Sequence, residues 1–335
     1  MKPRPDLLTL PSVKHKIITF IPVYNGEKWL PQTLESVARQ TLRPDRVIVS
    51  DNCSTDGTEQ FVKGFTGMAI EWQQNASNLG PGRNMNRGFE HAGETDFLHI
   101  LHADDVLDPK FYEAMVKAFE GCAGRGIGWC LDERIDENNE RLSISGTASG
   151  QVEELSRDSF LREKAEIGNQ ACSGTLLKTA YQPAPCVFPL DFPSVGDMLF
   201  YPRWGMTCEK IVRINQPLLK YRWHGMNDSN TQARDLNALV CQEWEVMQMV
   251  EQFRGHGPGF IRTLKLMGLF GVRSGIKAKR FKERGNVAFS REIVRVTKER
   301  IGWWMWFSAW LVVRTRDIVV YGILRRRKHP GNIFS

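Results

Sequence analysis

The first 120 residues alternate short apolar runs with amphipathic stretches, and this alternation predicts strands and helices in turn. The apolar runs are residues 16–24, 46–50, 68–72 and 96–101. The stretches with helical spacing of apolar positions are residues 27–40, 58–65, 82–92 and 109–120. A nearly continuous apolar run such as KIITFIPVY is typical of a strand covered on both faces of a parallel sheet. Strand and helix in alternation predict an α/β fold with right-handed crossovers.

The second half of the chain has a less regular pattern. Residues 130–160 are polar and rich in turn formers, so we expect loops or an irregular excursion there. Residues 170–180 and 208–222 add strand material, and a helix is expected at 235–254. This pattern divides the chain into an N-terminal tail of residues 1–15, an α/β domain of residues 16–234 and a C-terminal helical region of residues 235–335.

Polar side chains gather where the predicted strands end. Tyr24 and Asn25 follow the first strand, Asp51 closes the second, and Asp104 and Asp105 follow the fourth. In open α/β sheets, ligands bind beyond the carboxyl ends of the strands. The three positions therefore mark a candidate site, although turn and cap residues would also account for some of these side chains.

The pair of acids after the fourth strand is the sharpest local feature. Adjacent carboxylates at the end of an apolar strand carry a high desolvation cost unless water or a cation neutralises them. Asp104 and Asp105 offer the hard oxygen ligands that hold Mg²⁺ or Mn²⁺ against a diphosphate. Helix-capping acids ahead of Pro109 are the alternative.

Two further positions suit a nucleotide. Asp51 ends its strand with a carboxylate that can accept a hydrogen bond from a nucleobase N–H. Residues 78–88 (NLGPGRNMNRG) lack the Gly-Lys-Ser/Thr of a P-loop. Arg83 in this segment can bind a phosphate in bidentate fashion, and an ordinary surface arginine is the alternative.

The composition is that of a globular protein, with 335 residues, 41% of them apolar and 25% charged. The seven cysteines are odd in number and form no CxxC pair, so neither a disulfide framework nor a zinc ribbon is indicated. Residues 1–11 lack the apolar stretch of a secretory signal. We therefore expect a cytoplasmic protein with reduced thiols.

The net charge of +7 is unevenly distributed. Residues 254–328 hold 19 Lys and Arg against four acids, a net charge of +15, whereas the remaining residues carry −8. A basic tail is typical of proteins that bind nucleic acid, an anionic membrane surface or an acidic partner. No recognition motif accompanies the charge, so we expect no nucleic acid.

The basic tail is also rich in tryptophan. Residues 301–313 contain four tryptophans and no charge, and the apolar residues 318–324 run into four bases. Tryptophan favours the membrane–water interface, and apolar segments flanked by bases are typical of helices that lie in the plane of an anionic membrane. Residues 260–284 repeat the pattern more weakly, so we expect residues 260–328 to bind an anionic membrane surface. A helix buried against the α/β domain and a membrane-spanning helix are the alternatives.

Six segments, in order along residues 16 to about 230, resemble motifs of the family 2 glycosyltransferases. They are KIITFIPVYN, VIVSDNCSTDGT, NLGPGRNMNRGF, FLHILHADDVLDP, VGDMLFYPRW and PLLKYRWHGMNDS. The resemblance implies a GT-A fold, which is a Rossmann-like, mostly parallel sheet with flanking helices. It also implies inverting transfer of a sugar from a nucleotide-diphosphate sugar. The basic helical region at the C-terminus would be a membrane-associating addition.

The resemblance further implies roles for individual residues. Asp104 and Asp105 would stand in the region that contacts ribose and a divalent cation, Mn²⁺ or Mg²⁺. The residues implied to bind the nucleotide sugar are Pro22, Val23, Tyr24, Asn25, Asp51, Arg83 and Asp104.

The chain departs from the family's pattern at two acids. His102 stands where the family often has the first acid of its metal motif, and we assign it no ligand role. Gly196 and Asp197 stand for a Glu-Asp pair, so Asp197 would be the catalytic base. His224 matches a position that can approach the metal or the diphosphate, and a histidine satisfied within its loop is the alternative.

These features predict a metal-dependent, inverting glycosyltransferase, peripheral or monotopic on the cytoplasmic face of the cell membrane. We expect a UDP- or dTDP-sugar as donor, and a saccharide or lipid-linked acceptor in surface polysaccharide biosynthesis. One alternative is a sugar-nucleotide nucleotidyltransferase, although IPVYNGEKW matches its glycine-rich loop poorly. The other is a catalytically silent scaffold bound to the membrane.

Overall fold

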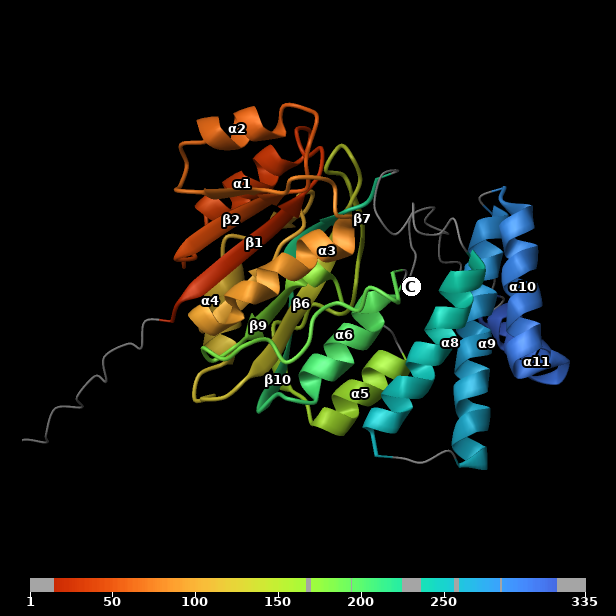
Figure 1. The fold of residues 1–335 in the computed structure, drawn as a ribbon. Helices are drawn as coiled ribbons and strands as arrows, with labels where there is room; N and C mark the ends of the chain where they lie inside the picture. Colours follow the sequence, from red (N-terminus) through yellow and green to blue (C-terminus); the bar gives the residue numbers. More distant parts are fainter. Residues whose placement is uncertain are drawn as a thin grey trace, which may run out of the picture.

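The computed structural model describes residues 15–166, 170–193, 195–224, 236–255, 259–283 and 285–317. The predicted N-terminal tail, apart from His15, lies outside the described residues, as do the predicted domain boundary at 234 and the apolar and basic segments at 318–328. Figure 1 shows a sheet flanked by helices, with a group of long helices beside it.

The first half of the chain confirms the predicted alternation of strands and helices. The strands are β1 (Ile17–Val23), β2 (Arg46–Asp51), β3 (Glu71–Gln74) and β4 (Phe97–Ile100). The helices are α1 (Leu30–Ala38), α2 (Thr58–Gly64), α3 (Pro81–Asn86), which continues as the 3₁₀ helix η1 (Arg87–Glu94), and α4 (Phe111–Ala118). The four strands are parallel in the order β3-β2-β1-β4, so their carboxyl ends share one edge of the sheet.

The prediction of a mostly parallel sheet is wrong for the other half, because the complete sheet is mixed. Its order continues from β4 through β9 (Thr175–Lys178), β6 (Gly126–Ile135) and β10 (Lys210–Arg222) to β5 (Val106–Leu107). β9 runs antiparallel to both β4 and β6, whereas β10 is parallel to β6. β9 begins at the side of the sheet where β4 and β6 end, so it runs antiparallel to both strands.

The expectation of an irregular excursion at 130–160 is also wrong. β6 extends to Ile135 and forms a hairpin with β7 (Arg141–Ile144), after which β8 (Val152–Glu154) pairs with β10. α5 (Arg157–Glu166) completes the segment. β7 and β8 are half-buried or exposed. Strands of this kind need no apolar run, and an apolar run is the signal that predicts a buried strand from the sequence.

Two apolar clusters cover the two faces of the sheet. α1 and α4 belong to the cluster that contains Ile17 and Ile21, whereas η1, α5 and α6 (Gly196–Gly205) belong to the cluster that contains Ile18 and Phe20. Neighbouring residues of β1 therefore point into opposite cores, as the continuous apolar run predicts. With both faces covered, the strand ends are where polar groups reach solvent.

In the part of the chain that the structure describes, four helices follow the sheet: α8 (Leu236–Phe253), α9 (Phe260–Glu283), α10 (Val287–Ile301) and α11 (Trp303–Asp317). α8 contacts α5 and α6 on one side and α9 on the other, as Figure 1 shows. A third apolar cluster joins α8, α9 and α10. No helix among the described residues combines the length and the apolar character that crossing a bilayer requires.

Candidate active site

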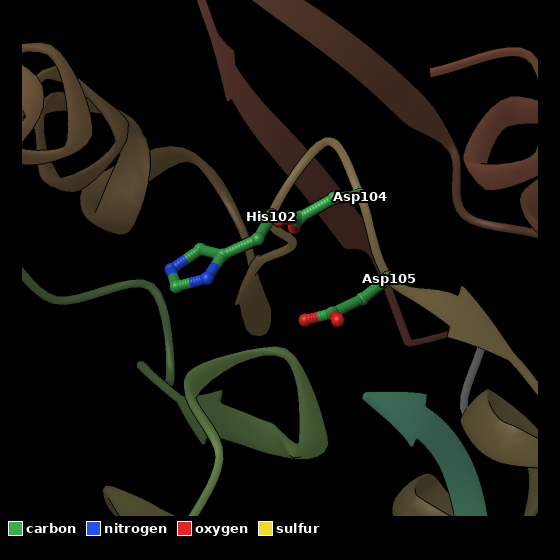
Figure 2. A group of neighbouring side chains, drawn as sticks. All are labelled: His102, Asp104 and Asp105. Carbon is green, nitrogen blue, oxygen red and sulfur yellow. The ribbon is translucent and has the colours of Figure 1, made fainter. Parts of the chain in front are cut away.

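The loop between β4 and β5 carries a compact group of potential metal ligands. The ligand atoms of His102, Asp104 and Asp105 all lie within 4.8 Å of one another. Figure 2 shows the three side chains on this loop, which leaves the sheet at the carboxyl end of β4. Asp104 is half-buried and Asp105 is fully buried, so the two carboxylates have different surroundings.

Asp105 is held by groups from distant parts of the chain. Ser173 donates its hydroxyl to Asp105 Oδ2 at 2.5 Å, and the backbone N–H of Arg222 donates to Asp105 Oδ1 at 2.9 Å. Burial, followed by the charge of Asp104, raises the pKa of Asp105 to about 7, while the charge of His102 and then the hydrogen bonds from Ser173 and Arg222 act in the opposite direction. Asp105 therefore changes its charge near neutral pH, which makes cation binding here sensitive to pH.

Ser173 is itself fixed from beneath by buried polar groups. His99 Nε2 lies 2.9 Å from the Ser173 carbonyl oxygen, and His99 Nδ1 lies 2.8 Å from the Tyr112 hydroxyl. Burial lowers the pKa of His99 to about 4, so the ring is neutral and can donate one proton and accept another. The Ser173 backbone is thereby anchored in the core beneath the carboxylates.

Asp104 contacts the end of β10. His224 Nε2 lies 2.9 Å from Asp104 Oδ2, and the Arg222 Nε donates to the Asp104 carbonyl oxygen at 3.0 Å. The Trp29 ring stacks on His224 with 5.7 Å between ring centroids, and the Arg222 guanidinium lies 4.4 Å from the Trp29 ring centroid. The fold thus brings His224 next to Asp104.

The donor set at this loop fits a divalent cation. Two carboxylates and an imidazole lie within reach of one ion, and carboxylate oxygens are the ligands that Mg²⁺ and Mn²⁺ prefer. Burial lowers the pKa of His102, but Cys172, Asp105 and Asp104 outweigh it and raise this pKa to about 10. A cation bound to Asp104 and Asp105 would lower the pKa of His102, because the cation would repel the positive charge of the protonated imidazole. His102 has no ligand role predicted from the sequence, but its position places it with Asp104 and Asp105.

The loops after β1 and β2 interlock at the same edge of the sheet. Val23 and Asp51 are paired in register at the strand ends. The backbone N–H of Asn25 donates to Ser54 Oγ at 2.8 Å, and Asn25 Oδ1 accepts from the backbone N–H of Thr55 at 2.9 Å. Asn25 has a φ of 52°, which the left-handed region permits for asparagine at little cost. The predicted nucleotide-binding residues at the ends of β1 and β2 are therefore neighbours.

The side chains of this group differ in their exposure. Asp51 is fully buried, and its carboxylate accepts hydrogen bonds from Ser54 and, at 3.0 Å, from Gln74 Nε2. Val23 is buried in the core, Pro22 is half-buried, and Tyr24 is 51% exposed. Tyr24 and Asn25 are thus the members whose side chains are exposed to a ligand.

The glycine-rich segment forms α3, and its asparagines are mainly structural. Asn84 accepts from Ser50 Oγ at 2.8 Å and from Asn75 Nδ2 at 2.9 Å, and it donates to the Ser50 carbonyl oxygen. Arg87 contacts Asn75 in the same network. Arg83, the predicted phosphate ligand, is exposed on α3 outside this network.

Asp197 lies on a different element from the carboxylate pair. It occupies the first turn of α6, is half-buried, and accepts a hydrogen bond from the backbone N–H of Met198 at 2.8 Å. Burial raises the pKa of Tyr201, one turn further along, and nearby Cys172 and Asp197 raise it further. Cys172 also raises the pKa of His102, so Cys172 lies near both the middle of α6 and the metal-ligand loop.

Comparison with known proteins gives consistent matches. The family model for glycosyl transferase family 2 matches residues 19–172. A GalNAc(5)-diNAcBac-PP-undecaprenol beta-1,3-glucosyltransferase from Campylobacter jejuni is 30% identical over 153 residues, which is 44% of this chain and 48% of that protein. The chain therefore spans about half the length of this relative.

Two solved structures share the fold. Residues 1–349 of Staphylococcus aureus TarS, in complex with UDP-GlcNAc, superpose with a TM-score of 0.55 at 16% identity, covering 86% of this chain and 92% of that one. The mannosyltransferase PcManGT from Pyrobaculum calidifontis, in complex with GDP-Man and Mn²⁺, gives 0.52 at 14% identity, with coverages of 94% and 83%. These likenesses show a GT-A-like α/β fold. The family match at residues 19–172 and the similarity to the Campylobacter glucosyltransferase identify this segment as a glycosyltransferase domain of the family 2 type.

Proposed function

We propose that the protein transfers a sugar, with inversion, from a nucleotide-diphosphate sugar to a hydroxyl group of an acceptor. One observation carries this proposal: the parallel strands β1, β2 and β4 end at one edge of the sheet, and there they present Asn25, Asp51 and the pair Asp104 and Asp105. A nucleotide and a cation-bound diphosphate need binding groups in this arrangement.

The proposed donor is a UDP- or dTDP-sugar. TarS, which shares the fold, binds UDP-GlcNAc, and this supports a uridine-type base. Pro22 to Asn25 would line the pocket, and Asp51 would accept the base N–H by exchanging its contact with Gln74 for one with the nucleotide. Arg83 is exposed on α3 and would neutralise donor charge from outside the buried asparagine network.

We propose that Asp104 and Asp105 hold a divalent cation with His102 beside them, and that His224 reaches the cation from its contact with Asp104. When bound, the cation acts as a Lewis acid that stabilises the negative charge on the departing diphosphate. Asp104 offers a partly exposed carboxylate, while Ser173 and the backbone of Arg222 hold Asp105 in place. The Mn²⁺ in the mannosyltransferase with the same fold supports this assignment.

Asp197 is the proposed catalytic base. Its half-buried carboxylate begins α6, and the backbone N–H of Met198 orients it. In an inverting transfer one base removes the proton of the acceptor hydroxyl as that oxygen attacks the anomeric carbon, and such a base contributes about 10²–10⁴-fold to the rate.

We propose that the acceptor is a saccharide, linked to lipid, in surface polysaccharide biosynthesis at the cytoplasmic face of the membrane. The Campylobacter relative is named for an undecaprenol-linked substrate. α11 leaves large apolar side chains exposed, with Trp304 at 77%, and the first turn of α9 does the same, with Ile261 at 81%. Arg314 lies near Trp310 on α11 and would face anionic lipid, with residues 260–328 as the proposed peripheral contact.

A nucleotide-release assay tests the proposed reaction. The wild-type protein is incubated with a panel of sugar nucleotides, with Mn²⁺ or a chelator, and with a saccharide acceptor. We expect release of UDP or dTDP that depends on the cation and is lost in Asp104→Asn. Asp158→Asn, an exposed acid on α5, serves as the control and should keep full activity. Release of pyrophosphate from a nucleoside triphosphate would indicate a nucleotidyltransferase, and no turnover of any donor would indicate a scaffold.

Membrane binding has its own test. Trp304→Ser combined with Phe307→Ser removes two exposed aromatic side chains from α11 and leaves its buried face intact. We expect this variant to float less with liposomes that contain anionic lipid. Equal flotation of wild type and variant would show that Trp304 and Phe307 do not contribute to membrane binding.

A further inference from the structure

Arg273 of α9 lies where four helices meet. Its Nε is 2.8 Å from Glu243 Oε1 of α8, and its Nη1 donates to the Ala165 carbonyl oxygen of α5 at 3.3 Å. Its Nη2 lies 3.9 Å from the Met198 sulfur of α6. A guanidinium is planar and presents its donors in a rigid fork, so contacts with three partners fix the distances between their helices.

Glu243 determines where this guanidinium sits. The Glu243 carboxylate is fully buried and is paired with Arg273 and with Lys277, one turn further along α9. Burial alone would raise the pKa of Glu243, but Lys277 and Arg273 outweigh it and lower this pKa. A buried carboxylate of this kind has a high cost unless cations remain beside it, so it holds both α9 cations against α8.

The contact with α6 involves the residue next to the proposed base. Met198 is 9% exposed, and its backbone N–H donates to Asp197 Oδ1 at 2.8 Å. A displacement of Met198 therefore also displaces the group that orients the Asp197 carboxylate. Ala165 lies in the last turn of α5, where a cation is favoured by the partial negative charge of the helix end.

We propose that Arg273 is a positioning residue for Asp197. By joining α8 and α9 to the ends of α5 and α6, Arg273 sets the angle at which the first turn of α6 presents its carboxylate to the acceptor. The C-terminal helices thus act on turnover from outside the substrate pocket. This inference rests on the role proposed above for Asp197.

Lys277 provides a matched control, because it pairs with the same buried acid from the same helix without a described contact to α5 or α6. We compare Arg273→Met, Arg273→Lys and Lys277→Met. Both methionine variants leave Glu243 with one cation and should lose similar thermal stability. Arg273→Lys keeps both charges but cannot reach three partners with a single ammonium group.

The measured quantities are kcat, the donor KM and the melting temperature. We expect Arg273→Met and Arg273→Lys to lower kcat by about tenfold or more with the donor KM within about twofold, since small misplacements of a reacting group have large effects on rate. Lys277→Met should keep kcat within about twofold of wild type.

Two results would overturn the inference: equal loss of kcat in Arg273→Met and Lys277→Met, or wild-type kcat in Arg273→Lys. Asp197→Asn, measured in parallel, separates this inference from the proposed function. If Asp197→Asn loses turnover while the Arg273 variants keep it, only the positioning role fails. If Asp197→Asn keeps turnover, the proposed base itself is refuted.

Discussion

The hydrogen bond from Ser173 to Asp105 provides a sharp test of the metal-ligand loop. In Ser173→Ala, the buried Asp105 carboxylate loses a donor at 2.5 Å, and the backbone N–H of His102 loses its acceptor at 3.1 Å. A hydrogen bond to a charged group contributes about 1.5–3 kcal/mol, equivalent to a factor of roughly 10–100 in an equilibrium constant. Groups that orient metal ligands have effects of this same size. We therefore expect Mn²⁺ affinity at pH 7 to fall by about 10–100-fold.

The pH dependence of this loss follows from the titration of Asp105. The pKa of Asp105 is raised to about 7 by burial and by Asp104, so a proton competes with the cation below that pH. In the wild-type protein, cation affinity should rise as the pH increases through about 7. Because Ser173 acts to lower this pKa, the rise in Ser173→Ala should move to higher pH. The variant's deficit should consequently be larger at pH 7 than at pH 9.

Electron paramagnetic resonance of free Mn²⁺, recorded at several pH values, measures the affinity directly. Ser290→Ala serves as the control, because it truncates another buried serine far along the chain, on α10. We expect the control to bind Mn²⁺ like the wild type. The reasoning would be refuted if Ser173→Ala bound Mn²⁺ with wild-type affinity at every pH, since Asp105 would then play no part in holding the cation.

Three further predictions follow from the described contacts. Asp197→Asn should keep donor binding in a calorimetric titration but lose about 10²–10⁴-fold in kcat, and unchanged turnover would contradict the assignment. Lys164 is buried with its pKa lowered to about 8, chiefly by burial, so between pH 8 and 10.5 the unfolded state binds more protons and stability rises with pH by roughly 1 kcal/mol per unit. Lys164→Met should abolish that rise in denaturant titrations. Gly271→Leu should destabilise the contact of α9 with α11 by about 1–3 kcal/mol and lower the melting temperature, because a Cβ at Gly271 would already lie 2.8 Å from the Ala309 Cβ.

Most elements of the first half can be predicted from the sequence because the necessary information is local. An apolar run or a helical spacing of apolar residues is visible in consecutive residues, whatever the element later contacts. The pattern also indicated which strand ends carry polar groups, and hence Asp51, Asp104 and Asp105. The pattern does not reveal the strands at 130–160, because β7 and β8 are half-buried or exposed and have no need of apolar residues.

The composition of the site was only partly visible in the sequence. His102 stands two residues before Asp104, so its proximity to the acids was a usable signal. Ser173 and Arg222, which hold Asp105, are 68 and 117 residues away from it along the chain. No spacing rule connects such positions, and the same is true of Arg273 and Met198.

The sequence by itself determined the alternation of strands and helices, the acids at the strand ends and the basic, tryptophan-rich C-terminal region. The tertiary structure decided the strand order, the antiparallel insertion of β9 between β4 and β6, and the partners of each buried charge. The physical reason is that hydrophobic periodicity describes neighbours along the chain, whereas strand pairing and the hydrogen bonds of buried carboxylates depend on which distant segments meet in the core.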